Sequence, residues 1–167
     1  GLGDGAAVVR HPDVNKVAFT GSTAVGREIA KAVAGTDKKL TLELGGKAAN
    51  IVFEDAPIDQ AIEGIVNGIF FNQGQVCCAG SRLLVQESIA EELVDKNTDI
   101  GAINSREQLD RIRELSKVGE EEGAERWSAP CVIPDNGFWF APTIFTGVQT
   151  SQTIAREEIF GPVLSVL

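Results

Sequence analysis

The sequence predicts an α/β protein with a largely parallel sheet. Short apolar runs of strand length alternate along the 167 residues with segments in which apolar residues recur at helical spacing. Several of the 18 glycines lie at the ends of these segments, where an α/β protein makes tight turns.

The first helix candidate lies between two strand candidates near the start of the chain. Residues 16–20 and 40–44 are apolar runs of strand length. Gly21 and Ser22 follow the first run, and an apolar stripe of helical spacing then extends towards Gly35. The members of this stripe are Val25, Ile29 and Val33.

A second helix candidate lies between strand candidates at residues 49–54 and 82–86. Asp55 and Pro57 begin it, and proline is tolerated in the first turn because its missing N–H would have no helical partner there. The apolar stripe of this helix consists of Ile58, Ile62, Ile65 and Ile69.

Two pairs of residues in the second half have the spacing of helix capping boxes. Ser88 and Glu91 begin one predicted helix, which ends early because turn residues follow from Asn97 onwards. Ser105 and Gln108 begin another. Its apolar face consists of Leu109, Ile112 and Leu115. We expect this helix to end near Gly119 or Gly123, and we interpret the acidic residues 120–122 as a solvated helix end.

The remaining segments are shorter. Residues 126–148 combine turn residues with strand candidates, and an apolar run from Val163 predicts a last strand that continues to Leu167. Gly1 is predicted to lie in a turn, and no methionine precedes it. We therefore expect the sequence to be a fragment of a longer protein.

Composition argues against several classes of function. A net charge of −9 disfavours nucleic acid and anionic membranes as partners, because both require clustered Lys and Arg. The sequence shows neither a membrane-spanning run nor a secretory signal, and its three cysteines, two of them adjacent, do not form a disulfide framework. We expect a cytoplasmic location. A single His and the lack of a Cys-x-x-Cys motif argue against a metal site.

Two candidate site segments lie in the first part of the chain. Gly21 and Ser22 begin a predicted helix, whose N-terminal N–H groups bind phosphate, although a simple helix cap is the more common role of such a pair. Glu43 lies within an apolar strand that ends at Gly45 and Gly46, and burial there would suit a general base. The alternation of apolar and polar residues over 40–44 fits equally well an acid on the exposed face.

Two further candidate segments lie later in the chain. Cys77 and Cys78 occupy a run of small residues between a helix and a strand, where a partly exposed thiol suits a nucleophile. The alternative is a pair of inert core cysteines. Glu158 precedes Phe160 by two positions, so both side chains would point the same way on an extended chain, and the carboxylate could bind ribose hydroxyls. An ordinary surface acid and a core phenylalanine are the alternative.

Together these four segments resemble the aldehyde dehydrogenase superfamily, in the family's order and along nearly the whole chain. The matching segments are Val17-Ala-Phe-Thr-Gly-Ser-Thr-Ala-Val-Gly26, Leu42-Glu-Leu-Gly-Gly-Lys47, Phe71-Asn-Gln-Gly-Gln-Val-Cys-Cys-Ala-Gly-Ser-Arg82 and Glu157-Glu-Ile-Phe-Gly-Pro162. The glutamate and cysteine motifs are specific enough to favour the functional interpretation of all four segments.

The resemblance implies an activity. In this family a cysteine thiolate attacks an aldehyde, hydride passes to NAD or NADP, and a glutamate activates the water that hydrolyses the thioester to a carboxylic acid. By this resemblance Cys77 is the nucleophile, Glu43 is the general base, and the Cys77 amide contributes to an oxyanion hole. The residues implied in cofactor binding are Gly21 and Ser22 at the pyrophosphate, Val25 at the adenine, Glu158 at the ribose, Phe160 near the nicotinamide, and Gly3 in an adenine loop.

The resemblance also implies a partial aldehyde dehydrogenase fold. Residues 1–45 would be the C-terminal part of the NAD(P)-binding domain and 46–167 part of the catalytic domain. The family's upstream oxyanion-hole asparagine is absent from the sequence, and family members continue the helix that stops here after Lys96, so we expect an internal loss near 96–97. For the full-length parent, an aldehyde substrate and a homo-oligomer are implied.

These departures lead to the hypothesis that this polypeptide alone is inactive or nearly so. Two other classes of function stay open at this point. A truncated paralogue could act as a non-catalytic interaction or scaffold protein. A thiol redox protein using Cys77 and Cys78 is less favoured, because adjacent cysteines form a strained disulfide.

Overall fold

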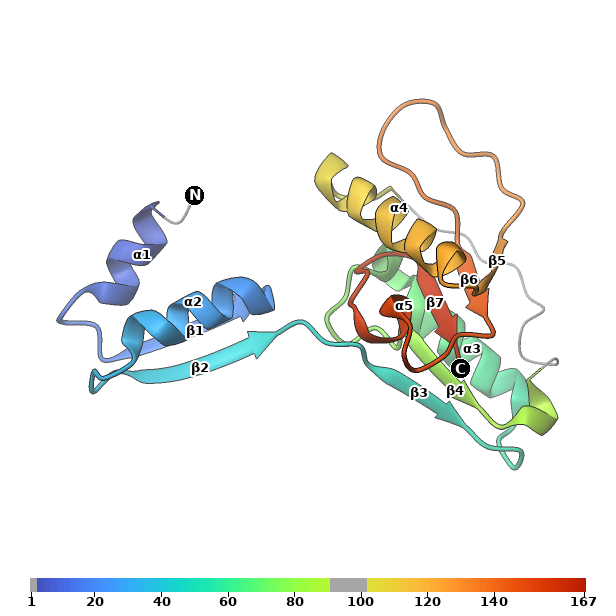
Figure 1. Ribbon diagram of the computed structural model, residues 1–167, viewed down its shortest axis with the longest axis horizontal. Coiled ribbons are helices and arrows are strands. Elements are labelled where there is room, and N and C mark those ends of the chain that lie inside the picture. Colours follow the sequence, from blue (N-terminus) through green and yellow to red (C-terminus); the bar gives the residue numbers. More distant parts are fainter. Residues whose placement is uncertain (1–2, 91–101) are drawn as a thin grey trace. The chain divides into compact units, whose positions relative to one another are not determined.

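The computed structural model describes residues 3–90 and 102–167 of the chain. Two units divide between Gly45 and Gly46: unit 1, Gly1–Gly45, and unit 2, Gly46–Leu167. Figure 1 labels helices and strands of each unit, with colours that follow the sequence. The assignment of these units to a nucleotide-binding and a catalytic domain stays a prediction.

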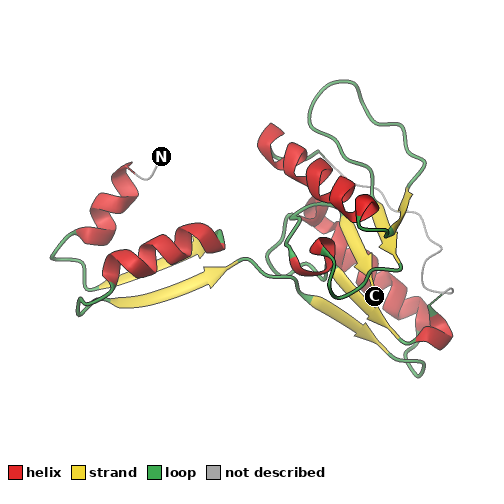
Figure 2. Ribbon diagram, viewed as in Figure 1, coloured by secondary structure: helices red, strands yellow, loops and turns green. Residues whose placement is uncertain are grey.

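Unit 1 contains a pair of parallel strands, and the longer of its helices packs against both (Figure 2). Its elements are α1 (Gly3–Arg10), β1 (Lys16–Gly21), α2 (Thr23–Val33) and β2 (Lys39–Leu44). The predicted strands and the intervening helix are confirmed, and Val17, Ile29 and Val33 form the buried core. Helix α1 was not predicted; its Val9 packs against this core, so tertiary contact overcomes the low helix propensity of Gly3 and Gly5.

Local interactions determine where α2 begins and ends. The Ser22 hydroxyl accepts a hydrogen bond from the Val25 N–H over 3.4 Å, and Gly35 follows the helix with a φ of +76°. Gly26 lies so close to β2 that a Cβ atom there would overlap the Leu44 side chain. The glycine therefore lets α2 lie directly on the strand.

Unit 2 contains a five-stranded sheet in the order β3-β4-β7-β6-β5. Among the strand pairs of the described residues only β5–β6 is antiparallel, so the prediction of a largely parallel α/β sheet is confirmed. The strands are β3 (Ala49–Val52), β4 (Arg82–Val85), β5 (Glu125–Ser128), β6 (Thr143–Thr146) and β7 (Val163–Val166). The helices are α3 (Ile58–Phe70), η1 (Phe71–Gly74), η2 (Glu87–Ile89), α4 (Arg106–Glu121) and α5 (Thr153–Arg156).

Helices α3 and α4 cover opposite faces of this sheet (Figure 1). Successive side chains of a strand point to opposite faces. On β6, Ile144 belongs to the core cluster that contains α3, whereas its neighbour Phe145 belongs to the cluster that contains α4. Unit 2 therefore has three layers with two hydrophobic cores.

The ends of α4 correct two details of the sequence interpretation. Ser105 caps the helix as predicted, its hydroxyl accepting from the Gln108 N–H over 3.2 Å. The left-handed glycine beyond the helix is Gly123, with a φ of +94°, whereas Gly119 lies inside the helix and packs against Ile154. The acidic end is more than solvated: Glu122 accepts two hydrogen bonds from Thr153 of α5, and these lower the pKa of Glu122.

Some predictions fall partly outside the described residues. The helix expected after Ser88 and the internal loss near 96–97 involve residues 91–101. Ser88 itself lies in η2 and donates a hydrogen bond to Glu54 Oε2 over 3.1 Å. Across residues 3–90 and 102–167, no helix has the length and apolar character needed to cross a membrane.

Candidate active site

The candidate site residues of unit 2 lie at one edge of its sheet. Cys77 and Cys78 precede β4, and Glu158 and Phe160 precede β7. Strands β3, β4 and β7 are adjacent and parallel, so their amino ends share an edge. The cysteine segment and the Glu158–Pro162 segment therefore meet at this edge, here called the amino edge.

The turn after α3 delivers the cysteines to the amino edge. Three consecutive residues have left-handed backbone conformations, with φ of +48° at Asn72, +58° at Gln73 and +70° at Gly74. Such conformations cost free energy for residues other than glycine. The Asn72 side-chain amide offsets part of this cost by donating to the Gln75 carbonyl oxygen over 3.2 Å.

Cys77 and Cys78 are the two central residues of a β-turn. The Ala79 N–H donates to the Val76 carbonyl oxygen over 2.9 Å. The Cys77 N–H takes no part in this hydrogen bond, which closes the turn. Both cysteine side chains are exposed. The alternative of two inert core cysteines is therefore wrong.

At Gly74 the cysteine segment packs against the loop that precedes β7. A Cβ atom at Gly74 would overlap the carbonyl group of Gly161. Only glycine allows these two backbones to touch with a positive φ on one of them. Two of the four predicted segments are thus packed directly against each other.

The loop that carries Glu158 is held by helix α4. Gln108 Nε2 donates to the carbonyl oxygens of Ile159 and Phe160 over 2.8 and 2.9 Å. Phe160 has a φ of +55°, so the expectation that Glu158 and Phe160 point the same way on an extended chain is wrong. Both side chains are half-buried. The long-range bonds from Gln108 explain why a phenylalanine keeps a left-handed conformation here.

Lys47, which sequence analysis gave no role, also lies at the amino edge, two residues before β3. Burial lowers its pKa to about 8, Arg82 adds to this lowering, and Glu158 opposes it. Its Nζ atom is buried and has no hydrogen-bond partner among the described residues. The sequence feature that could have indicated a role for Lys47 is its place in the Leu42–Lys47 motif, immediately before an apolar strand.

The candidate residues of unit 1 lie at the carboxyl ends of its strands. Ser22 begins α2 directly after β1, and Glu43 is the penultimate residue of β2. Glu43 is exposed, as the alternation along its strand predicts, and Val25 packs partly into the core of unit 1. Gly3 is the first residue of α1. The approach of Glu43 to Cys77, which belongs to the other unit, stays a prediction.

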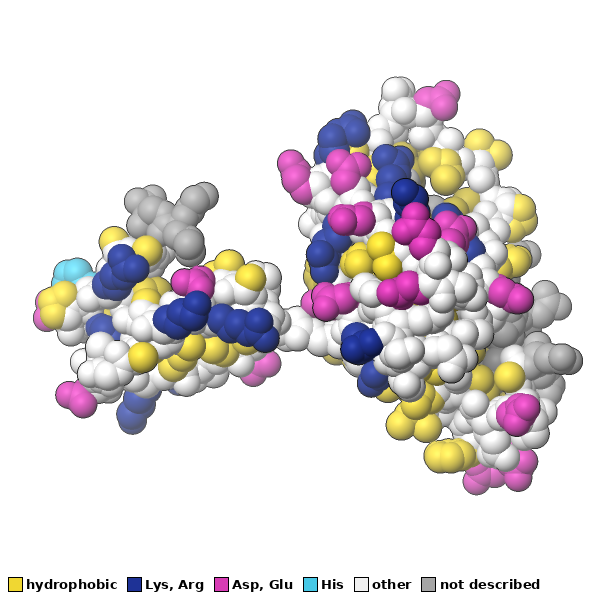
Figure 3. All heavy atoms as spheres, viewed as in Figure 1, with side chains coloured by type: hydrophobic (Ala, Val, Ile, Leu, Met, Phe, Trp, Pro, Cys, Tyr) yellow, Lys and Arg dark blue, Asp and Glu magenta, His cyan; other side chains and the backbone are white. Residues whose placement is uncertain are grey.

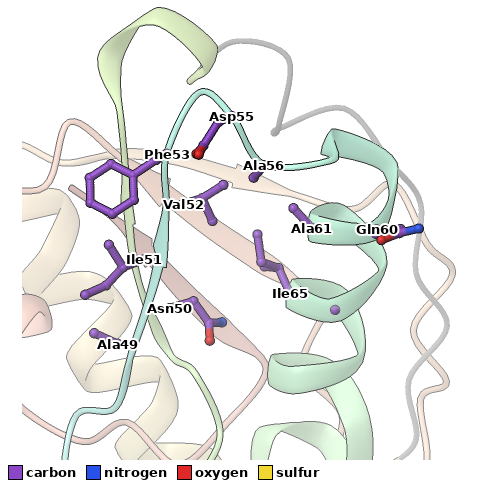
Figure 4. Close-up of a pocket in the computed structure, with 11 residues that line it drawn as sticks. Ala49, Asn50, Ile51, Val52, Phe53, Asp55, Ala56, Gln60, Ala61 and Ile65 are labelled. Atoms are coloured by element: carbon purple, nitrogen blue, oxygen red, sulfur yellow. The ribbon is translucent and has the colours of Figure 1, made fainter.

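A hollow of about 540 Å³ lies away from these residues, between β3 and α3. In Figure 4, Val52 and Ile65 face each other across it, whereas Ile51 and Phe53 point to the other side of β3. Ile51 and Phe53 are each 63% exposed, and Figure 3 shows apolar side chains on the surface over β3. None of the predicted site residues lines this hollow.

Comparison with known proteins finds a family match over residues 3–167, to the aldehyde dehydrogenase family. An aldehyde dehydrogenase of Davidiella tassiana is 49% identical over 179 aligned positions, which cover 97% of this chain and 36% of that protein. The alignment is longer than this chain, so the relative carries residues without a counterpart inside the matched region.

Solved structures agree with this match. The crystal structure of an NAD-dependent aldehyde dehydrogenase from Sinorhizobium meliloti has a TM-score of 0.90 and 41% identity, covering 98% of this chain and 36% of that one. An NAD+ complex of aldehyde dehydrogenase from Bacillus cereus has a TM-score of 0.89 at the same identity and coverages. The chain spans about a third of the length of these relatives.

Proposed function

The chain belongs to the aldehyde dehydrogenase family, and on this basis we propose that it carries part of the machinery with which a longer protein oxidises an aldehyde to a carboxylic acid. The cofactor of this reaction is NAD or NADP. The observation that carries the proposal is the exposed Cys77 at the centre of a β-turn, in a segment packed against the loop that presents Glu158.

Cys77 is the nucleophile in this proposal. Its thiolate adds to the aldehyde carbonyl carbon and forms a thiohemiacetal, and the Cys77 N–H donates to the oxygen that becomes negative. The exposure of the side chain supports access of an aldehyde, and the fixed turn supports a constant direction of attack. Cys78, the other central residue of the turn, has no assigned catalytic role.

Each unit carries residues suited to one part of a dinucleotide. The first turn of α2, with Gly21 and Ser22, offers backbone N–H groups to a pyrophosphate, and Val25 offers an apolar contact to the adenine. The Glu158 carboxylate suits ribose hydroxyls, with Phe160 beside the nicotinamide and Gly3 near the adenine. A bound cofactor of this kind supplies the hydride acceptor.

Glu43 is the general base for the last step. Its carboxylate takes a proton from the water that attacks the thioester on Cys77, and the acid product leaves. Glu43 is exposed at the end of β2 and so is accessible to water. This role requires unit 1 to bring Glu43 near Cys77.

The chain alone is expected to be inactive or nearly so. Removing one oxyanion donor from a well-studied hydrolase lowers kcat by about 10²–10³-fold. The Cys77 amide is one such donor, and the family's asparagine donor has no counterpart in this sequence. The residues that carry the general base and the pyrophosphate turn also belong to the smaller unit.

A non-catalytic role in protein association is the second candidate. The observation that favours it is the exposure of Ile51 and Phe53 on the edge strand β3, because exposed apolar edge strands bind other chains. Titration with NAD or NADP separates the two proposals: binding supports an assembled cofactor site, and the absence of binding supports the association role.

Acylation by p-nitrophenyl acetate tests the nucleophile without a cofactor. Cys77 is expected to be acetylated faster than Cys78 and Cys131, which are also exposed and serve as reference thiols in the same chain. Peptide mass spectrometry locates the acetyl group, and Cys77→Ala should abolish the fast phase while Cys78→Ala retains it. Equal rates at all three thiols would contradict the proposal.

The inactivity of the chain is tested with an aldehyde and NAD+. No formation of NADH above the background of the Cys77→Ala variant is expected. Aldehyde-dependent NADH formation that Cys77→Ala abolishes would show that the chain alone is an active enzyme.

A further inference from the structure

A buried ammonium group, that of Lys47, and a partly buried guanidinium group, that of Arg82, lie at the amino edge, and their charges act on each other. The Lys47 Nζ and Arg82 Nε atoms are buried without a hydrogen-bond partner in the part of the chain that the structure describes. The backbone segments that carry the two side chains are paired, because the backbone N–H of Arg82 donates to the Ala48 carbonyl oxygen over 3.1 Å. Burying a charge is costly unless an opposite charge is near, so this pair requires a counter-charge.

Glu158 supplies a counter-charge to Lys47. Burial is the main cause that lowers the pKa of Lys47, and the neighbouring charge of Arg82 acts in the same direction. The negative charge of Glu158 acts in the opposite direction and so stabilises the ammonium form. The Glu158 side chain is half-buried, so water screens this interaction only in part.

The backbone of Glu158 is fixed separately by α4. Arg111 Nη2 donates to the Glu158 carbonyl oxygen over 3.3 Å, and Gln108 holds the next two carbonyl groups. With the main chain held in this way, the remaining freedom of Glu158 lies in rotation of its side chain. The positive charge of Lys47 attracts the carboxylate at the end of that side chain.

We propose that Lys47 is a positioning residue for Glu158: its buried ammonium group draws the Glu158 carboxylate towards the amino edge and keeps it oriented to accept hydrogen bonds from the cofactor ribose. Arg82 makes the Lys47 ammonium depend more strongly on Glu158, because its own positive charge destabilises that ammonium when Glu158 is absent. The inference rests on the proposed cofactor role of Glu158, but the interaction between the two side chains exists without a cofactor and can be measured without one.

The first experiment follows the Lys47 side chain by NMR in the isotopically labelled chain, with pH as the variable. Glu158→Gln should lower the pKa of Lys47, and Arg82→Met should raise it. Glu157→Gln is the matched control: this neighbouring acid pairs with Arg111 at 3.7 Å, so its loss should leave the Lys47 titration unchanged. A Lys47 titration that is the same in Glu158→Gln as in the unmodified chain overturns the positioning role.

The second experiment measures NAD+ binding by calorimetry. Lys47→Met should weaken binding by about tenfold, the size of one charge-assisted hydrogen bond lost, with partial rescue in Lys47→Arg. Lys117→Met, which removes an exposed lysine paired with Glu121, should bind NAD+ as the unmodified chain does. Unchanged binding in Lys47→Met overturns the inference. No binding by the unmodified chain instead overturns the proposed function, and the NMR titration alone then decides whether Lys47 and Glu158 interact.

Discussion

The two units hold their candidate site residues by different means. In unit 1, Ser22 is fixed by a hydrogen bond to Val25, three residues away, and Glu43 by its place in a two-stranded sheet. In unit 2, contacts between distant segments fix the cysteine turn and the Glu158 loop: Gly74 against Gly161, and Gln108 to residues about fifty positions further on.

The cores of the units differ in the same way. The buried core of unit 1 consists of Val17, Ile29 and Val33 among the described residues, whereas unit 2 has two larger clusters, one on each face of its sheet. Small domains bury too little apolar surface to be very stable, and two-stranded sheets are marginal. We infer that unit 2 holds Cys77 and Glu158 rigidly, and that unit 1 holds Glu43 and the α2 start less firmly.

Gly74→Ala is expected to have the largest effect. The new Cβ would meet the Gly161 backbone and require a left-handed alanine, so unit 2 should lose about 3 kcal/mol of unfolding free energy. Urea unfolding followed by tryptophan fluorescence measures this, since Trp127 and Trp139 both belong to unit 2.

Gly35→Ala is the matched control in unit 1. Gly35 also has a positive φ, +76°, but no atom lies within 4 Å of a Cβ placed there. Gly35→Ala should therefore lower the unfolding free energy of unit 1 only by the cost of a left-handed alanine, about 1 kcal/mol. Hydrogen exchange of the α2 amides measures this loss. Equal costs in the two variants would mean that the Gly74–Gly161 contact does not stabilise the cysteine turn.

Gln108→Ala should have the next largest effect. It removes two hydrogen bonds to the Ile159 and Phe160 carbonyl groups, and should lower the stability of unit 2 by about 2 kcal/mol. Adding Phe160→Gly should recover about half of the loss, because glycine adopts a positive φ without strain. Urea unfolding of the single and double variants tests this, and no recovery in the double variant would show that Phe160 is unstrained.

The same difference explains what the sequence could predict. Helix α2 and the start of α4 follow from apolar spacing and serine caps, which are local signals, and both were predicted. Helix α1 and the left-handed Phe160 depend on partners distant in the sequence, so no local pattern indicated them.

The candidate site divides along the same line. The matching motifs identified Cys77, Glu43 and Glu158 by type and order, and their exposure or burial had to come from the fold. Lys47 went unassigned because the charges that act on it, Arg82 on the neighbouring strand and Glu158 in the loop before β7, do not adjoin it in the sequence.

The stability of unit 2 should depend on pH through Lys47. An unfolded lysine titrates near 10.5 and Lys47 near 8, so between these values the unfolded chain binds more protons and stability rises with pH. Below pH 8 the destabilisation is fully present. The slope for one proton is at most about 1.4 kcal/mol per pH unit.

Lys47→Met should remove this rise, and Lys117→Met, at an exposed site, should retain it. Urea unfolding of unit 2 at a series of pH values between 7 and 10.5 is the measurement. A rise that persists in Lys47→Met would mean that another group is responsible.

The smallest expected change compares two serine caps. Ser22 caps α2 in unit 1 and Ser105 caps α4 in unit 2, each through its hydroxyl and the N–H three residues on, so replacing either with alanine should cost about 1 kcal/mol. The consequence should differ, because a loss of this size unfolds a larger fraction of a marginal unit. Ser22→Ala should therefore speed hydrogen exchange throughout β1, α2 and β2, whereas Ser105→Ala should only lower the urea midpoint of unit 2. If exchange in unit 1 is as slow as in unit 2 and Ser22→Ala leaves it so, the weak support inferred for Glu43 is wrong.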